Sequence, residues 1–300
     1  MKVLVTGGAG FIGSHVVDLL VEKQHQVIVV DNLTTGKKEN INENAKLYEI
    51  DVRDEGLGVV FEEEHPELVV HLAAQISVPR SIEDVFLDES VNVAGTLHIL
   101  ELMRKYGAHK IVYSSSAAVY GDPLFLPVEV EHPCTPVSPY GTSKYLAEEY
   151  IKLYQRMYGI EYTILRYANV YGPRQIAEGE AGVISVFIDR LKAGRDLVIN
   201  GDGKQTRDFV YVRDVARANL AALTSGQSVI VNIGTGVETS LLELVAELEK
   251  VSGKEVPVCY GPERPGDILR SCLCPEKALT LLGWKAETSF ERGLKSTFDQ

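Results

Sequence analysis

The first thirteen residues place a cluster of glycines between an expected strand and an expected helix. The range Lys2–Thr6 is short, apolar and mostly β-branched, and the residues after the glycines are apolar at helical spacing. In such a turn, Gly7 permits a tight bend, Gly10 lets the backbone approach a pyrophosphate, and Gly13 lets the helix pack closely on the sheet. The helix N-terminus then offers N–H groups and a partial positive charge to phosphates. The predicted dinucleotide-binding residues of this turn are Gly7, Gly10, Phe11, Ile12 and Gly13.

A second expected strand, Gln26–Val30, ends in Asp31 and Asn32. A carboxylate at this position accepts hydrogen bonds from the adenosine ribose hydroxyls and repels a 2′-phosphate, which favours NAD over NADP. Lys37 and Lys38 lie nearby in the sequence and would favour a phosphate instead. On the basis of the Asp31 carboxylate, we nevertheless predict NAD as the cofactor.

Apolar β-rich runs alternate with helical patterns through the first half of the chain, as in a parallel sheet covered by helices on both faces. We therefore expect an α/β fold with a Rossmann-type doubly wound parallel sheet. The further expected strands are Lys46–Ile50, Leu68–Leu72, Lys110–Ser114 and Tyr162–Arg166, and the clearest expected helices are Asn92–Tyr106 and Pro139–Tyr158.

The rhythm changes after about Arg166, where proline and glycine become frequent and the expected elements shorten. This change predicts a smaller C-terminal α/β lobe that binds the substrate. The expected NAD-binding domain covers 1–168 and about 212–238, and the expected substrate lobe covers about 169–211 and 239–300.

Composition excludes several other classes of protein. The 300 residues carry a net charge of −12, which argues against nucleic acid or an anionic membrane surface as a partner. No apolar stretch approaches the length of a membrane span, and the N-terminus enters its first strand without room for a signal peptide. We expect a cytoplasmic protein with reduced thiols and no metal site, because the four cysteines fit no metal-ligand spacing. These cysteines are Cys134, Cys259, Cys272 and Cys274.

Tyr140 and Lys144 are spaced to lie on one helix face, one turn apart. A free tyrosine has a pKa of about 10, and half ionising it at neutral pH requires roughly 4 kcal/mol of stabilisation of the phenolate. An ammonium about 5 Å away supplies roughly 3 kcal/mol at an effective dielectric constant near 20. The nicotinamide ring of NAD⁺ would add a second positive charge. We therefore predict Tyr140 as the catalytic base, Lys144 as its activating cation and Ser116 as the partner of the hydroxyl being oxidised. Ser114 and Ser115 are expected to serve as strand-end backbone partners.

Several motifs together carry a family resemblance. The segments TGGAGFIG, HLAAQ, SSSAAVYG, YGTSK and RYANVYGPRQ resemble those of an extended short-chain dehydrogenase/reductase. Together with GDGKQTRDFVYVRDV, NIGTG and ERPGD, they most closely resemble UDP-glucose (UDP-galactose) 4-epimerases. The resemblance extends over nearly the whole chain.

This resemblance implies roles for further residues. Asp51 and Val52 would contact the adenine, the loop of Leu72, Ala73, Ala74 and Gln75 would line the cofactor, and Asn92 would reach its phosphates. Asn169, Arg207 and Arg264 would hold the UDP pyrophosphate, Asp267 would contact the uridine ribose, and the backbone near Val198 and Asn200 would contact the uracil. The predicted substrate residues are Ser116, Asn169, Val183, Val198, Asn200, Arg207, Arg264, Asp267 and Ser271.

The resemblance also narrows the reaction. Sugar-nucleotide dehydratases and UDP-glucuronate decarboxylases carry carboxyl groups just after the residue that matches Ser116, where this chain has Ala117 and Ala118. The remaining prediction is NAD-dependent 4-epimerisation of a UDP-hexose through a transient 4-keto sugar. The alternatives are a UDP-glucuronate 4-epimerase, an NAD-dependent oxidoreductase that releases NADH, and a non-catalytic NAD-binding regulator.

Two finer predictions concern the hexose and the oligomer. In the family, a tyrosine at the position of Ser271 confines the enzyme to glucose and galactose, and a small residue there admits N-acetyl sugars. Glucuronate would need a cation near its carboxylate, for which Arg80 and Arg174 are the candidates. Surplus apolar side chains on Asn92–Tyr106 and Pro139–Tyr158 predict a homodimer paired through a four-helix bundle.

Overall fold

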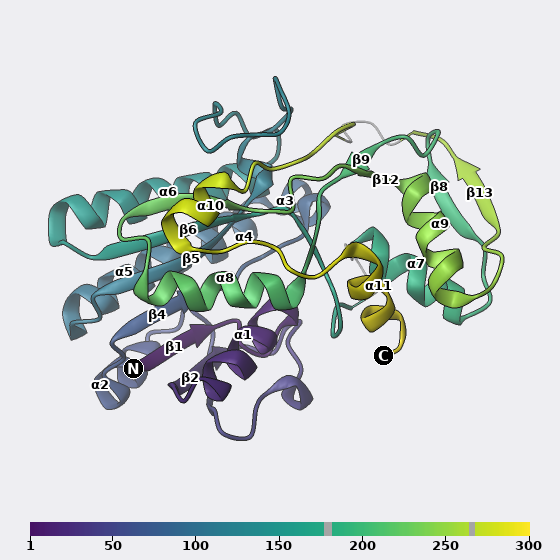
Figure 1. Ribbon diagram of the computed structural model, residues 1–300. Coiled ribbons are helices and arrows are strands. Elements are labelled where there is room, and N and C mark those ends of the chain that lie inside the picture. Colours follow the sequence, from purple (N-terminus) through teal and green to yellow (C-terminus); the bar gives the residue numbers. More distant parts are fainter. Residues whose placement is uncertain (177–181, 264–267) are drawn as a thin grey trace.

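The computed structural model describes residues 1–176, 182–263 and 268–300 (Figure 1). Its centre is a seven-stranded sheet with the order β11-β6-β5-β4-β1-β2-β3, in which every pairing is parallel. The strands of this sheet are β1 (Lys2–Thr6), β2 (Gln26–Asp31), β3 (Lys46–Glu49), β4 (Leu68–His71), β5 (Lys110–Ser116), β6 (Glu161–Tyr167) and β11 (Val229–Ile233).

The strand order reverses direction at β1, which lies between β2 and β4. In an open parallel sheet, a reversal of this kind leaves a crevice outside the carboxyl ends of the strands, and ligands bind there. The order confirms the predicted Rossmann-type doubly wound sheet. It also places the glycine turn, which follows β1, at the crevice.

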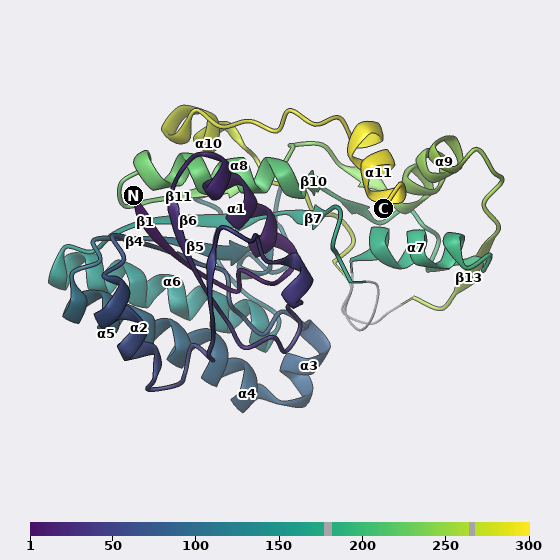
Figure 2. The ribbon, with the colours of Figure 1, turned by 90° about the horizontal axis from the view of Figure 1, so that it is seen from below.

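Helices cover both faces of the sheet because successive strand residues point to opposite sides. On one face, Val3 and Val5 pack with residues of α1, α8 and α10. On the other face, Leu4 packs with residues of α2, α5 and α6, and Figure 2 shows these two layers. The helices are α1 (Phe11–Glu22), α2 (Leu57–Glu64), α3 (Val78–Glu83), α4 (Val85–Glu89), α5 (Gly95–Tyr106), α6 (Pro139–Tyr158), α7 (Val183–Lys192), α8 (Val212–Thr224), α9 (Leu241–Ser252), α10 (Glu276–Leu282) and α11 (Phe290–Phe298).

A smaller lobe with its own apolar cluster lies beside the sheet, on the right in Figure 1. Its cluster joins α7, α9 and α11 to the parallel pair β8 and β13. Two further pairs lie between this lobe and the sheet: β7 with β10, seen in Figure 2, and β9 with β12, seen in Figure 1. These strands are β7 (Asn169–Tyr171), β8 (Leu197–Asn200), β9 (Thr206–Arg207), β10 (Phe209–Tyr211), β12 (Thr239–Ser240) and β13 (Val258–Gly261).

We propose a division into two domains close to the one expected from the sequence. The stretch 212–238 contains α8 and β11, which pack on and extend the main sheet. The expected division differs from the structure at α10, which it assigns to the substrate lobe. Ala278, Leu282 and Trp284 are buried in the apolar cluster of the sheet with α8 and β11, because they cover apolar surface at that end of the sheet.

One local feature differs from the sequence-based expectations. The predicted helix Asn92–Tyr106 begins in a π-helical segment, η2 (Ser90–Ala94), and becomes an α-helix only at Gly95. π-Helical turns are rare and frequent at functional sites. The short 3-10 helices are η1 (Lys38–Asn40) and η3 (Ala117–Val119).

Within the described ranges, none of the helices combines the length and apolarity needed to cross a membrane.

Close packing of α1 on the glycine turn requires a glycine at position 13. A Cβ atom on Gly13 would lie 2.0 Å from the carbonyl oxygen of Gly7, and Gly7 itself has a φ of +69°. The helix therefore lies against the turn at a distance that no side chain permits. This observation agrees with the role that the sequence predicts for Gly13.

We expect Gly13→Ala to lower the free energy of unfolding by about 2–4 kcal/mol, since the added methyl group must displace the backbone of the turn. Urea unfolding followed by circular dichroism measures this change. The matched control is Gly58→Ala in α2, where the nearest atom to an added Cβ lies 3.6 Å away. That control should be neutral or stabilising, and equal losses in the two variants would contradict the packing argument.

Candidate active site

The glycine turn has the features of a dinucleotide site. Gly10 caps the N-terminus of α1 without a side-chain hydrogen bond, and an added Cβ there would meet only the carbonyl oxygen of Gly7, at 3.3 Å. The backbone is therefore open to a ligand, and the first N–H groups of the helix point toward it. Asp31 holds the turn in place, because its Oδ2 accepts a hydrogen bond from the Ala9 N–H at 2.9 Å. The residues present fit the phosphates and ribose of NAD.

The expected adenine end of the site is ordered by a polar network at the ends of β2 and β3. The Asn32 amide donates to Asp51 Oδ2 at 2.8 Å, and Arg53 pairs with the same carboxylate at 2.8 Å. Arg53 holds the pKa of Asp51 well below its usual range. Val52 is buried, and its carbonyl hydrogen-bonds the His98 ring. Sequence analysis missed Arg53, although its position two residues after Asp51 was visible.

The loop after β4 lies directly against the glycine turn. A Cβ on Gly7 would lie 2.7 Å from the backbone nitrogen of Ala73. Thr6 Oγ1 accepts hydrogen bonds from the Leu72 and Ala73 N–H groups, so its own proton is donated to His71 Nδ1 at 2.7 Å. Burial lowers the pKa of His71 to about 3, which keeps its ring neutral. Segments far apart in the sequence thus form one predicted cofactor surface.

Asn92 links this loop to the catalytic helix. Its Oδ1 accepts from the Gln75 N–H at 2.8 Å, and its Nδ2 donates to the Gln75 carbonyl and to Ser143 Oγ, each at 3.0 Å. Ala74 follows Ala73 in the same loop and is half-buried. Asn92 is itself buried, so the structure gives it a positioning role. Its contact with the cofactor phosphates stays a prediction.

The predicted catalytic residues meet where β5 ends and α6 begins. Ser138 caps α6, Pro139 occupies its first turn, and the Tyr140 N–H is bound by Ser81 Oγ at 3.1 Å. The Tyr140 phenol hydrogen-bonds Ser116. Both residues remain half-buried, so a ligand can reach them.

Lys144 lies one turn further along α6 and is buried. Its Nζ lies 4.7 Å from the centre of the Tyr113 ring. Burial lowers the pKa of Lys144 to about 8, against the opposing effect of Glu148. Burial also raises the pKa of Tyr140, and the Ser116 hydrogen bond offsets only part of this rise. The sequence-based argument considered the ammonium and left out the desolvation of the phenolate, which acts in the opposite direction.

A buried ion pair joins α6 to strand β6 of the sheet. Glu148 accepts from Arg166 Nη2 at 2.6 Å and Nε at 3.0 Å, and from Ser115 Oγ at 2.5 Å. Ser115 pairs with Arg166 in the sheet, as expected of a strand-end residue, and its side chain also donates to Glu148. The position of Glu148, four residues after Lys144, could have shown that both lie on one face of the helix.

The predicted substrate residues outside the main sheet lie on the smaller lobe and on the strand pairs between this lobe and the sheet. Asn169 is exposed at the start of β7, Arg207 lies on β9, and Arg270, the neighbour of Ser271, forms a bridge with Thr206. Ser271 therefore lies in the segment that runs beside β9, the strand that contains Arg207. Val183 begins α7, and Val198 and Asn200 lie on β8. Arg264 and Asp267 lie outside the described residues.

Sequence analysis missed Asp208, a buried residue between β9 and β10. Its carboxylate links this part of the chain to the loop after β11 and to the segment of Leu273. Its carboxylate accepts from the N–H groups of Thr235 at 2.8 Å, Gly236 at 3.2 Å and Leu273 at 3.2 Å. Burial raises the pKa of Asp208, and these donors oppose the rise. Asp208 thereby fixes the extended segment that contains Ser271 beside β9.

Two further observations bear on the chemistry. Ala117 and Ala118 form η3 directly after Ser116, so no carboxyl group lies at the positions that dehydration would require. Across the described ranges, no cluster of histidine, cysteine or acidic side chains is arranged to hold a metal ion.

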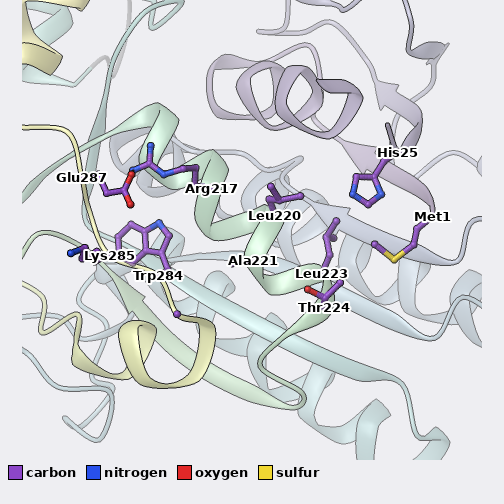
Figure 3. Close-up of a pocket in the computed structure, with 11 residues that line it drawn as sticks. Met1, His25, Arg217, Leu220, Ala221, Leu223, Thr224, Trp284, Lys285 and Glu287 are labelled. Carbon is purple, nitrogen blue, oxygen red and sulfur yellow. The ribbon is translucent and has the colours of Figure 1, made fainter. Parts of the chain in front are cut away.

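One pocket lies away from this site. It has a volume of about 360 Å³ and is lined by residues that include Met1, His25, Arg217, Thr224 and Trp284, which Figure 3 shows. Met1 precedes β1 and Thr224 ends α8, so the pocket opens at the amino ends of the strands. We place the active site at the carboxyl ends of the strands, because the glycine turn and the catalytic residues meet there.

Sequence comparison establishes the family. Residues 3–234 match the NAD dependent epimerase/dehydratase family. A Methanocaldococcus jannaschii protein provisionally named UDP-glucose 4-epimerase is 54% identical over 294 residues, covering 98% of this chain and 96% of that protein. The chain belongs to the NAD dependent epimerase/dehydratase family, which confirms the resemblance found in its motifs.

Solved structures agree with this assignment. The UDP-glucose 4-epimerase of Thermotoga maritima with UDP-glucose is 46% identical, with a TM-score of 0.97, covering 100% of this chain and 98% of that chain. The UDP-N-acetylglucosamine 4-epimerase of Methanobrevibacter ruminantium, in complex with UDP-N-acetylmuramic acid, is 36% identical, with a TM-score of 0.95 and coverage of 99% and 97%. The fold is shared with both.

Burial of Lys144 should make stability depend on pH in a defined direction. The pKa of Lys144 is about 8 in the folded chain and about 10.5 in an unfolded chain. Between these values the unfolded chain binds more protons, so the contribution of Lys144 to stability rises with pH. The full rise is on the order of 3 kcal/mol.

Lys144→Met should lack this rise between about pH 8 and about pH 10. Urea unfolding at several pH values in this range measures the slope. Lys192→Met, at an exposed position of α7, is the control and should keep the slope of the parent. Equal slopes in Lys144→Met and the parent would show that the lysine is not held in a perturbed state.

Proposed function

We propose that this protein is an NAD-dependent 4-epimerase that interconverts UDP-glucose and UDP-galactose. The observation that carries the proposal is the contact of Tyr140 with Ser116 beside the buried Lys144, at the edge of the sheet where the glycine turn lies. The alanines after Ser116 favour a reaction that needs no second acid or base. The family, the NAD cofactor and the activity of the UDP-glucose 4-epimerase relatives support the same conclusion.

The residues of the site have separable tasks. Ser116 orients the C4 hydroxyl, and Tyr140 accepts its proton while the C4 hydride leaves the sugar. Bound NAD supplies the acceptor and later the donor of that hydride. Lys144 provides positive charge near the phenolate that Tyr140 becomes. The 4-keto sugar then turns and takes the hydride back on its opposite face, with the proton returned by Tyr140, so there is no net redox change.

This route needs a firm hold on UDP and a loose hold on the hexose. Arg207 and Asn169 are our candidates for the pyrophosphate, because the β9 and β7 strands bring both to the rim of the smaller lobe. We assign Arg264 and Asp267 by resemblance alone. Arg80 and Arg174 are the two arginines considered as partners of a glucuronate carboxylate. Arg174 is already ion-paired with Asp18 at 2.8 Å, which disfavours UDP-glucuronate as the substrate.

The purified protein should convert UDP-glucose to UDP-galactose without accumulating NADH. Separation of the products from UDP-glucose, UDP-GlcNAc and UDP-glucuronate tests the assignment directly. Stoichiometric release of NADH would instead identify an oxidoreductase that ends at the keto sugar or acid.

We further propose a cytoplasmic homodimer paired through α5 and α6. The apolar residues predicted to take part in pairing are Leu97, Leu100, Tyr145, Leu146, Tyr150 and Tyr154. Of these, Leu146 and Tyr150 are exposed, as are Met157 and Tyr158 on the same helix. Leu100 is instead buried against the sheet. A cytoplasmic location is consistent with the absence of disulfides among the described cysteines.

Tyr140→Phe should reduce epimerisation by about a hundredfold or more, because only the proton-transferring hydroxyl is lost. Binding of NAD should persist, as judged by cofactor that co-purifies. Tyr150→Phe, on the exposed face of the same helix, is the matched control and should retain parental turnover. Retention of more than about a tenth of the activity in Tyr140→Phe would exclude this residue as the base.

Ser271→Tyr should suppress turnover of UDP-GlcNAc and spare UDP-glucose. Ser271 is half-buried beside the strand of Arg207, where a phenol ring would fill the space needed by an acetamido group. The ratio of kcat/KM for the two substrates measures the effect, and Ser271→Ala should leave that ratio unchanged. A similar response of both substrates to Ser271→Tyr would show that the residue does not gate the pocket.

A further inference from the structure

The charges of two buried carboxylates, Glu148 and Asp88, act on Lys144. Among the ion pairs of the described residues, an arginine partner is found for Glu148 and not for Asp88. Glu148 is paired with Arg166. Asp88, on α4, is 1% exposed, and its Oδ1 accepts hydrogen bonds from the neutral amides of Gln75 at 2.7 Å and Asn92 at 3.1 Å. Among the described residues, no ion pair within 4.0 Å involves Asp88. Its negative charge is therefore balanced only by charges at longer range.

Hydrogen bonds connect Asp88 to the turn of helix that carries the catalytic pair. Asn92 Nδ2, which donates to Asp88, also donates to Ser143 Oγ at 3.0 Å. Ser143 Oγ in turn donates to the carbonyl of Tyr140 at 3.0 Å. Asp88 is thus held in a fixed place relative to Tyr140 and Lys144.

The other groups that face Lys144 do not supply an unbalanced charge. Tyr113, from β5, lies under the ammonium, and burial raises its pKa well above the usual value, so it stays neutral. His71, from β4, is neutral because burial lowers its pKa to about 3. On α6 itself, Glu148 is paired with Arg166, and Tyr140 is the reacting group. Asp88 lies on α4, which packs against α6, and its carboxylate is the other charge that acts on Lys144.

We propose that Asp88 is the counter-charge of Lys144 and sets the pH range in which the Tyr140–Lys144 pair works. Nothing in the epimerisation chemistry requires a carboxylate here, so Asp88 is a positioning residue whose effect is electrostatic. The inference rests on the proposed function for its kinetic consequence, while its electrostatic content can be measured without turnover.

Asp88 acts in the same direction on both members of the pair. Burial lowers the pKa of Lys144, and Glu148 and Asp88 raise it. Burial raises the pKa of Tyr140, the Ser116 hydrogen bond lowers it, and Asp88 raises it further. Loss of this single charge should therefore lower both pKa values together.

Asp88→Asn tests the proposal, because an asparagine oxygen can still accept from Gln75 and Asn92. We expect both limbs of the pH profile of kcat to move to lower pH by on the order of one unit. The matched control is Glu89→Gln, which removes one charge from the neighbouring exposed position of α4 and should leave the profile in place. Unshifted limbs with reduced turnover would overturn the proposal and leave Asp88 a structural role alone.

A second measurement does not depend on epimerisation. The ultraviolet absorbance of tyrosinate, taken as a difference from the corresponding Tyr140→Phe protein, reports the ionisation of Tyr140. Tyr140 should ionise at lower pH in Asp88→Asn than in the parent, and an unchanged titration would overturn the proposal. A parent protein that epimerises no UDP-sugar would refute the proposed function, and this titration would still decide the role of Asp88.

A double-mutant cycle gives a third test through stability. If Asp88 and Lys144 are charge partners, Asp88→Asn should destabilise the parent and stabilise the Lys144→Met background, where the carboxylate is left uncompensated. Urea unfolding of the four proteins measures the coupling. Equal effects of Asp88→Asn in both backgrounds would show that the two residues do not interact.

Discussion

Burial of the Lys144 ammonium is the constraint on which the active site depends. An ammonium loses its hydration when it leaves water, so it stays charged only where nearby carboxylates compensate. Glu148 and Asp88 provide negative charge from α6 and α4, and Arg166 balances Glu148 from β6. The packing of α4, α6 and the sheet is therefore also an electrostatic arrangement. A helix position that only buried apolar surface would not need these partners.

The same region shows how the fold joins cofactor and proton chemistry. β1 lies at the point where the strand order reverses, so the glycine turn and the ends of β4 and β5 open on one crevice. Thr6, His71 and Asn92 connect the loops around that crevice through hydrogen bonds of 2.7–3.1 Å. Asp208 holds together the segments that carry Arg207 and Ser271, the two residues that we propose to contact the substrate. Firm contacts can thus be reserved for the nucleotide while the sugar remains free to turn.

Much of this arrangement could be predicted because it is carried by local patterns. The strands at the start of the chain follow from β-branched runs, and α6 occupies the predicted range Pro139–Tyr158. The interval between Tyr140 and Lys144 is one helical turn wherever the helix lies. The π-helical start at Ser90 and the docking of α10 on the sheet were not predictable, since both depend on contacts with distant segments.

The amino-acid sequence by itself determined the glycine turn, the alternation of strands and helices, and the catalytic spacing, because each depends on neighbouring residues and on the geometry of one element. Only the tertiary structure decided which buried charges meet. Asp88 and Arg166 lie on other elements than Lys144 and Glu148, and the contacts between them are set by the order of the strands and by the faces that the helices cover. Electrostatic energies in a buried site depend on distance and desolvation, which exist only after the chain has folded.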